Sequence, residues 1–302
     1  MLSWKMKAIV QSVLSVLPAS QTWNRWFQRN ITKSLELGEA RFLEKWEQCA
    51  RHLGVLSELR KPNPIIMELG TGWFPITPIG FALSGAKKVY SVDRQSLIDR
   101  DRVLKTLKFF ERMSASDRLK LPSEGAERLR ELLSHASRCS AEEMLSELGV
   151  SILVADARNI ALPSSCIDAF TSNNTLEHIP RGIIAEIFGE FHRLGKPDAV
   201  MVHFIDLADH YAGFDPRINV FNFLRFEEKE WRWYNSDLHF QNRLRVNDYR
   251  SLHGDSGWVV EAEDNVSGTK EMLGRFDVAA EFQSYSADDL LVYKSWMISR
   301  KA

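Results

Sequence analysis

Two short stretches combine residue types that can bind a nucleotide. The turn Gly70-Thr71-Gly72 follows an apolar run that ends in Glu68 and Leu69. Asp93 closes a second apolar run further along the chain. Glycines in such a turn let a ligand approach the main chain, and an acid at the end of the second strand can accept hydrogen bonds from two ribose hydroxyls. The pattern predicts one β-α-β unit over residues 65–93 with a nucleotide-type loop at its first turn.

The stretch at 173–178 brings further polar chemistry. His178 is a candidate general base because an imidazole titrates near neutral pH, or else it holds its loop by a hydrogen bond. Glu177 and His178 are both expected to open the next helix and to face the substrate. A Glu-His pair also permits a divalent metal, but no further ligands stand at a metal-site spacing, so we expect no metal.

Two kinds of ligand compete for the glycine turn. A dinucleotide site would use G-x-G-x-x-G, and here Pro75 replaces the third glycine. The stretch Glu68-Leu69-Gly70-Thr71-Gly72, with Asp93 after it, instead resembles motif I of class I S-adenosylmethionine (SAM) dependent methyltransferases. That family often has a further glycine where this chain has Phe74. A tight turn in another α/β protein is the remaining alternative.

The resemblance extends along the chain and implies SAM as the cofactor. Asn174-Thr175-Leu176-Glu177-His178-Ile179 is similar to the small-molecule, type 11-like branch of the family. It implies that Asp156 or Ala157 contacts adenine, and that Asn173 and Asn174 lie beside the methionine half. The implied cofactor-binding residues are Glu68, Gly70, Thr71, Gly72, Asp93, Asp156, Ala157, Asn173 and Asn174.

The order of apolar runs gives the expected fold, an α/β doubly wound, Rossmann-like seven-stranded sheet with N-terminal helices and helical insertions. The resemblance implies that the last strand is antiparallel and lies between the fifth and the sixth. The later strands are expected at 151–157, 167–174, 199–206, 257–261 and 290–298.

The chain divides into an N-terminal helical extension, 1–60, and a methyltransferase domain, 61–302, with insertions at about 94–150 and 207–254. Apolar spacing predicts helices at 6–17 and 35–56. Between them, Trp23–Arg29 either packs on the domain, forms a lid over the cofactor, or lies at a membrane interface. The insertion at 94–150 either shapes the substrate site or is an external elaboration.

The second insertion is the expected place to recognise a substrate, because loops beyond the carboxyl ends of parallel strands line the ligand crevice. Its tryptophans with Asn, Asp and Arg suit a sugar or another hydroxylated acceptor, or a half-buried subdomain. His203, Asp206 and His210 mix strand and loop, which favours a hydrogen-bonded set over a metal cluster. The candidate substrate-binding residues are Glu177, His210, Trp231 and Arg243.

Composition limits the partners. A formal net charge of −1 gives no strong nucleic-acid signal. Three cysteines far apart suit a reducing, cytoplasmic location, and no apolar run is long enough for a transmembrane segment, although the N-terminal helices could make a peripheral membrane contact. We expect methylation, at oxygen, of a small-molecule or glycan-like acceptor. The alternatives are an NAD-binding oxidoreductase and a non-catalytic SAM-fold interaction protein.

Overall fold

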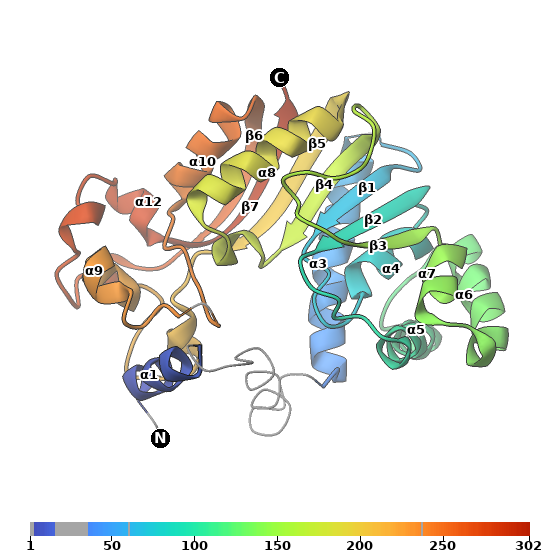
Figure 1. Cartoon of the computed structure of the whole chain (residues 1–302), viewed down its shortest axis with the longest axis horizontal. Coiled ribbons are helices and arrows are strands. Elements are labelled where there is room, and N and C mark those ends of the chain that lie inside the picture. Colours follow the sequence, from blue (N-terminus) through green and yellow to red (C-terminus); the bar gives the residue numbers. More distant parts are fainter. Residues whose placement is uncertain (1–2, 16–35, 60, 237) are drawn as a thin grey trace.

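The computed structural model describes residues 3–15, 36–59, 61–236 and 238–302. A central sheet with helices on both faces dominates the structure (Figure 1). The segment Trp23–Arg29 lies outside the described residues, so its three interpretations stay predictions.

The sheet has seven strands in the order β3-β2-β1-β4-β5-β7-β6. Strand β7 is antiparallel to both of its neighbours, β5 and β6, and the other pairings are parallel. This confirms the expected fold and the expected place of the last strand. The bounds are β1 Ile65–Leu69, β2 Lys88–Asp93, β3 Val150–Val154, β4 Ile167–Asn173, β5 Gly195–Asp206, β6 Trp258–Ser267 and β7 Val292–Lys301.

The side chains of successive strand residues point to opposite faces of the sheet. Ile66 packs with the helices of one face, and Met67 packs with those of the other. The first face is covered by α3 (Glu39–Glu58), α4 (Ile76–Leu83), α5 (Arg100–Ala115), α6 (Ser123–His135), the turn η1 (Ala136–Arg138) and α7 (Ala141–Glu147). The second is covered by α8 (Arg181–Leu194) and α10 (Val246–Asp255).

The insertion at 94–150 is helical, as expected, and local signals set its helices. Asp99 caps α5 by accepting a hydrogen bond from the Arg102 amide, and Ser140 with Glu143 forms a capping box on α7. A Cβ on Gly125 of α6 would run into the Leu83 carbonyl oxygen, so α6 can lie this close to α4 only with glycine there.

A third apolar cluster joins the first helix to the second insertion. Trp4 of α1 (Trp4–Ser15) is buried with Tyr211 and Trp231, and its amide donates a hydrogen bond to Asp215 over 3.0 Å. Figure 1 shows α1 beside α9, well away from α3. The cluster includes residues of η3 (His210–Gly213), η4 (Asn222–Arg225), α9 (Glu228–Trp231), α11 (Lys270–Leu273), η5 (Ala280–Phe282) and α12 (Ala287–Leu291).

The apolar face that predicted the first helix points outward in its described part. Side chains at Met6, Ile9, Val10 and Val13 are exposed, and the helix is anchored by Trp4 and Ala8 instead. Across the described ranges, no helix combines the length and apolarity needed to span a membrane.

The aromatic contacts between α3 and α5 give a stability prediction. Phe110 is fully buried, with its ring centroid 4.9 Å from that of Phe42 and 5.7 Å from that of Trp46. Phe110→Ala should lower the free energy of unfolding by about 3–5 kcal/mol, because a large cavity remains. Urea denaturation measures it, with Trp233→Ala as the control, since Trp233 is 76% exposed. Equal losses in both variants would contradict this account of the core.

Candidate functional site

A cavity of about 670 Å³ opens at the carboxyl ends of β1, β2 and β4. The strand order reverses between β1 and β4, and ligands of open α/β sheets bind at such a switch point. Its walls are the turn after β1, the end of β2, the loop after β4 and one side of α3. The lining residues are Leu37, Arg41, Lys45, Glu68, Leu69, Gly70, Thr71, Gly72, Trp73, Phe74, Ile76, Thr77, Val92, Asp93, Arg94, Gln95, Asn173, Asn174, Thr175, His178 and Ile179.

The glycine turn has the geometry that its sequence predicts. Gly70 and Gly72 have φ angles of +91° and +66°, in the region that favours glycine. A Cβ on Gly70 would overlap the Thr175 side chain, so glycine also lets this turn approach the loop after β4. A Cβ on Gly72 would meet nothing within 4 Å, so open space lies beside the main chain where a ligand would approach.

Asp93 ties the turn to the second strand. The amide of Gly72 donates to one carboxylate oxygen over 3.3 Å, and the amide of Gln95 donates to the other over 3.0 Å. The side chain is half-buried and lines the cavity. Lone pairs remain on both oxygens, which fits the expected ribose contact.

Glu68 lies at the inner end of the same cavity. Its side chain is 3% exposed and accepts a hydrogen bond from the Ser91 hydroxyl over 2.6 Å, and that hydroxyl lies 2.7 Å from the Thr71 hydroxyl. Burial raises the pKa of Glu68 to about 7. Glu68 therefore connects β1, β2 and the glycine turn.

A smaller chamber of about 240 Å³ adjoins the cavity and shares Leu69, Val92 and Asp93 with it. Asp156 and Ala157, expected at the adenine, line this chamber. Hydrogen bonds from Arg158 hold the exposed carboxylate of Asp156 and lower its pKa to about 2. Ala157 is buried.

The end of β4 presents two amides to the cavity. The Asn173 side-chain oxygen lies 3.0 Å from Nε2 of His52, while its Nδ2 has no partner among the described residues. Asn174 has a φ of +49°, and its side-chain oxygen is likewise buried without a partner there. Buried polar atoms of this kind normally pair, so both are available to a ligand.

The turn η2 (Leu176–His178) places the two residues expected at the substrate. His178 is exposed, and its Nδ1–H donates to the Phe240 carbonyl over 2.8 Å, which leaves Nε2 with a free lone pair. Glu177 is 1% exposed, and neither carboxylate oxygen has a partner among the described residues. Burial raises the pKa of Glu177 well above its usual value.

The fold brings His210 to the same place, from the turn η3 at the end of β5. Its ring centroid lies 5.1 Å from that of His178. Glu177, His178 and His210 each offer a ligand atom, and these atoms all lie within 4.8 Å of one another. The sequence spacing alone did not indicate this group of three residues.

His203 is not part of this group. Its ring lies 2.8 Å from the Ser172 hydroxyl and is stacked on Phe188, as expected for a hydrogen-bonded histidine.

Two expected substrate residues lie elsewhere. Trp231 is 1% exposed inside the cluster that anchors α1. Arg243 is buried, donates to the carbonyl oxygens of Phe223 and Phe226, and pairs with Glu228 and Glu281. Both side chains stabilise the second insertion instead of lining the cavity, because the loops of the insertion bury their large side chains in its own interior.

The sequence interpretation also missed part of the wall. Leu37, Arg41 and Lys45 reach the cavity from α3 and the residue before it, whereas the helices of the insertion at 94–150 do not appear in its lining. The spacing of Arg41 and Lys45 puts both on one helix face, and this is the sequence signal that could have identified them. His52 of the same helix supports Asn173, and nothing in the local sequence indicates that contact.

The buried Glu68 predicts a pH dependence of stability. Its folded-state pKa lies above the unfolded value of 4.5, so the folded state binds more protons between about pH 4.5 and 7, and stability falls as the pH rises through that range. Glu68→Gln should remove a penalty on the order of 3 kcal/mol at pH 8 relative to pH 5. Urea denaturation at both pH values measures it, with the exposed Glu142→Gln as the control. Parallel pH profiles for Glu68→Gln and the parent chain would contradict the prediction.

Comparisons with known proteins bear on this site. A family model described as a methyltransferase domain matches residues 125–203, which include β3, β4 and α8. No curated protein matches the sequence.

Solved structures with a similar fold include two methyltransferases. One is a geranyl diphosphate methyltransferase in complex with SAM, at 12% identity and a TM-score of 0.47, covering 87% of this chain and 90% of that one. The other is the magnesium protoporphyrin IX methyltransferase of Synechocystis with bound SAH, at 10% identity and a TM-score of 0.45, covering 85% and 83%.

The match over 125–203 includes β4, whose end lines one side of the cavity, and the Asp93-bound glycine turn lines the other side. The chain therefore matches a methyltransferase domain over residues 125–203, within a sheet that has the expected doubly wound strand order.

Proposed function

We propose that this enzyme methylates a hydroxyl oxygen of a small or glycan-like acceptor. The observation that carries the proposal is the position of His178, which lines the cavity while its Nδ1 is bound to the Phe240 carbonyl. A hydroxyl group must lose a proton as it is methylated, so it needs an acceptor for that proton at this place.

The residues around the cavity fit the cofactor. Asp93 offers carboxylate oxygens for ribose, Ala157 offers an apolar chamber for adenine, and the unpartnered amide atoms of Asn173 and Asn174 suit the amino acid portion. Bound SAM supplies a methyl group on a sulfonium, ready for in-line attack. The remaining task of this chain is to align an acceptor and exclude water.

We propose that His178 accepts the proton that the acceptor hydroxyl loses. Its Nδ1–H bond to the Phe240 carbonyl fixes the ring and its tautomer, so that Nε2 can accept a hydrogen bond from an acceptor hydroxyl. His210 and Glu177 stand next to it. We propose that both contact the acceptor or a group bound with it. Trp231 and Arg243 have no part in this proposal.

We also propose a cytoplasmic location and a peripheral membrane contact through α1. The three cysteines are free, which fits the expected reducing, cytoplasmic compartment. Met6, Ile9, Val10 and Val13 form the exposed face of α1 that would make the predicted peripheral membrane contact.

Cofactor binding can be measured directly. Isothermal titration should show SAM binding and no NAD binding, and Asp93→Ala should weaken SAM at least tenfold, about 1.4 kcal/mol. Asp198→Ala is the control, because Asp198 lies at the surface and pairs with Lys61 away from the cavity. NAD binding in place of SAM would favour the oxidoreductase alternative, and no binding of either would favour the non-catalytic one.

The role of His178 calls for a screen of hydroxylated acceptors by release of S-adenosylhomocysteine. With any acceptor found, His178→Ala should lower kcat by about a hundredfold or more, while SAM affinity stays within twofold. His135→Ala, an exposed histidine on α6 paired with Glu147, should leave kcat unchanged. Activity of His178→Ala at the parent level would exclude His178 from the chemistry.

A further inference from the structure

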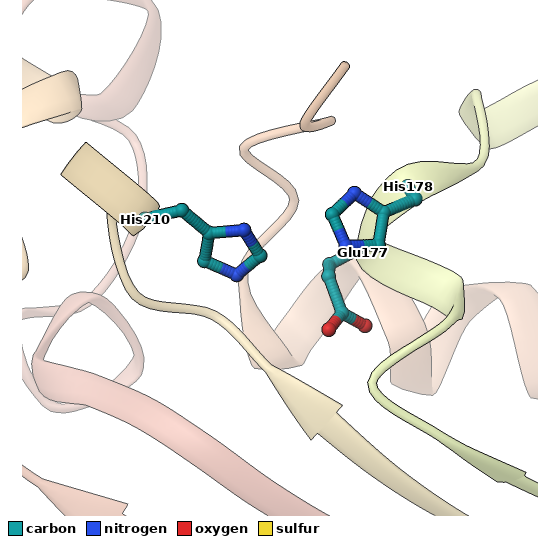
Figure 2. A group of neighbouring side chains, drawn as sticks. All are labelled: Glu177, His178 and His210. Carbon is teal, nitrogen blue, oxygen red and sulfur yellow. The ribbon is translucent and has the colours of Figure 1, made fainter. Parts of the chain in front are cut away.

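Three side chains from two separate segments converge beside the cofactor cavity. Glu177 and His178 come from η2, after β4, and His210 comes from η3, after β5. Figure 2 shows both imidazole rings and the carboxylate directed toward one shared space. Because β4 and β5 are parallel neighbours, the segments that follow them emerge at the same edge of the sheet.

Glu177 is the unusual member of the group. Its carboxylate is almost fully buried and has no hydrogen-bond partner among the described residues. An ionised carboxylate in this position costs several kcal/mol unless a cation or a proton compensates it. The Glu177 carboxylate is buried close to two imidazoles. This position indicates that a cation is missing from the space between them.

The two histidines can offer nitrogen lone pairs to a cation. The Nδ1–H bond of His178 to the Phe240 carbonyl leaves Nε2 as a lone-pair donor, the arrangement typical of metal-binding histidines. The ring of His210 lies beside that of His178, with the two ring centroids 5.1 Å apart. A carboxylate oxygen of Asp206 lies 3.8 Å from Nε2 of His210, too far for a good hydrogen bond.

We propose that Glu177, His178 and His210 bind one divalent first-row transition metal ion, such as Zn²⁺, Mn²⁺ or Fe²⁺. Two imidazoles and one carboxylate favour these ions over Ca²⁺ and Mg²⁺, which prefer all-oxygen sites. Ligand bonds of about 2.0–2.2 Å require the three atoms to close from within 4.8 Å to about 3–3.5 Å of one another, a change that side-chain rotation can supply.

The site would also have room for a substrate. Three protein ligands leave at least one coordination position open, as in catalytic metal sites. His178 lines the cofactor cavity, so that open position lies beside the methyl-transfer site. An acceptor hydroxyl bound there would lose its proton more easily, because the metal lowers its pKa. In that case His178 acts as a ligand, and this use of the metal rests on the proposed function, whereas metal binding itself does not.

The test is metal titration of the full chain after chelator treatment and dialysis. Titration with MnCl₂ and ZnCl₂ by calorimetry, and with CoCl₂ by visible absorption, should each show one ion per chain. Glu177→Gln and His210→Ala should each weaken binding at least tenfold. Glu177→Gln keeps the side-chain shape and removes the buried charge, so it should fold, and a thermal melt checks this.

His135→Ala is the matched control, because His135 is an exposed histidine paired with a glutamate on another part of the surface. It should bind metal as the parent chain does. No saturable binding, or binding that survives both Glu177→Gln and His210→Ala, would overturn the metal site. SAM titration of the same metal-free sample separates the two proposals: SAM binding without any metal site leaves the proposed function standing, and metal binding without SAM leaves the metal site standing.

Discussion

The close approach of the turn after β1 to the loop after β4 is the contact on which the site depends. Gly70 lies against Thr175 at a distance that no side chain on residue 70 would allow. The parallel pairing of β1 with β4 sets this approach, and Asp93 fixes the other side of the turn through the Gly72 amide. As a result, Asp93 and the glycine turn, expected to hold the cofactor, line the same cavity as His178, which is proposed to contact the acceptor.

The same region carries buried acidic groups that a purely structural core would avoid. Glu68 accepts hydrogen bonds from the side chains of Ser91 and Thr77, and burial still raises its pKa. Glu177 has none among the described residues. Unsatisfied charges of this kind lower stability, and natural proteins tend to keep them where function requires them. A bound cofactor, acceptor or metal would supply the missing partners.

Most of the fold could be predicted from local sequence, since alternating strands and glycine turns leave signals within a few residues. The turn at Gly70 and the acid at Asp93 are examples, whereas the antiparallel place of β7 followed only from the resemblance. The second insertion was harder, because Trp231 and Arg243 look like ligand-binding residues in sequence and are instead buried by contacts with Trp4, Glu228 and Glu281. Nothing local could show that His210 meets Glu177, since only the pairing of β4 with β5 brings them together.

A crystal structure of the chain with S-adenosylhomocysteine would show whether the cofactor occupies the cavity between Asp93 and His178. The ribose hydroxyls should lie within hydrogen-bond distance of Asp93, the adenine in the chamber lined by Ala157, and the sulfur facing the space next to His178. A ligand bound at another edge of the sheet, or in this cavity with its ribose away from Asp93, would contradict this placement.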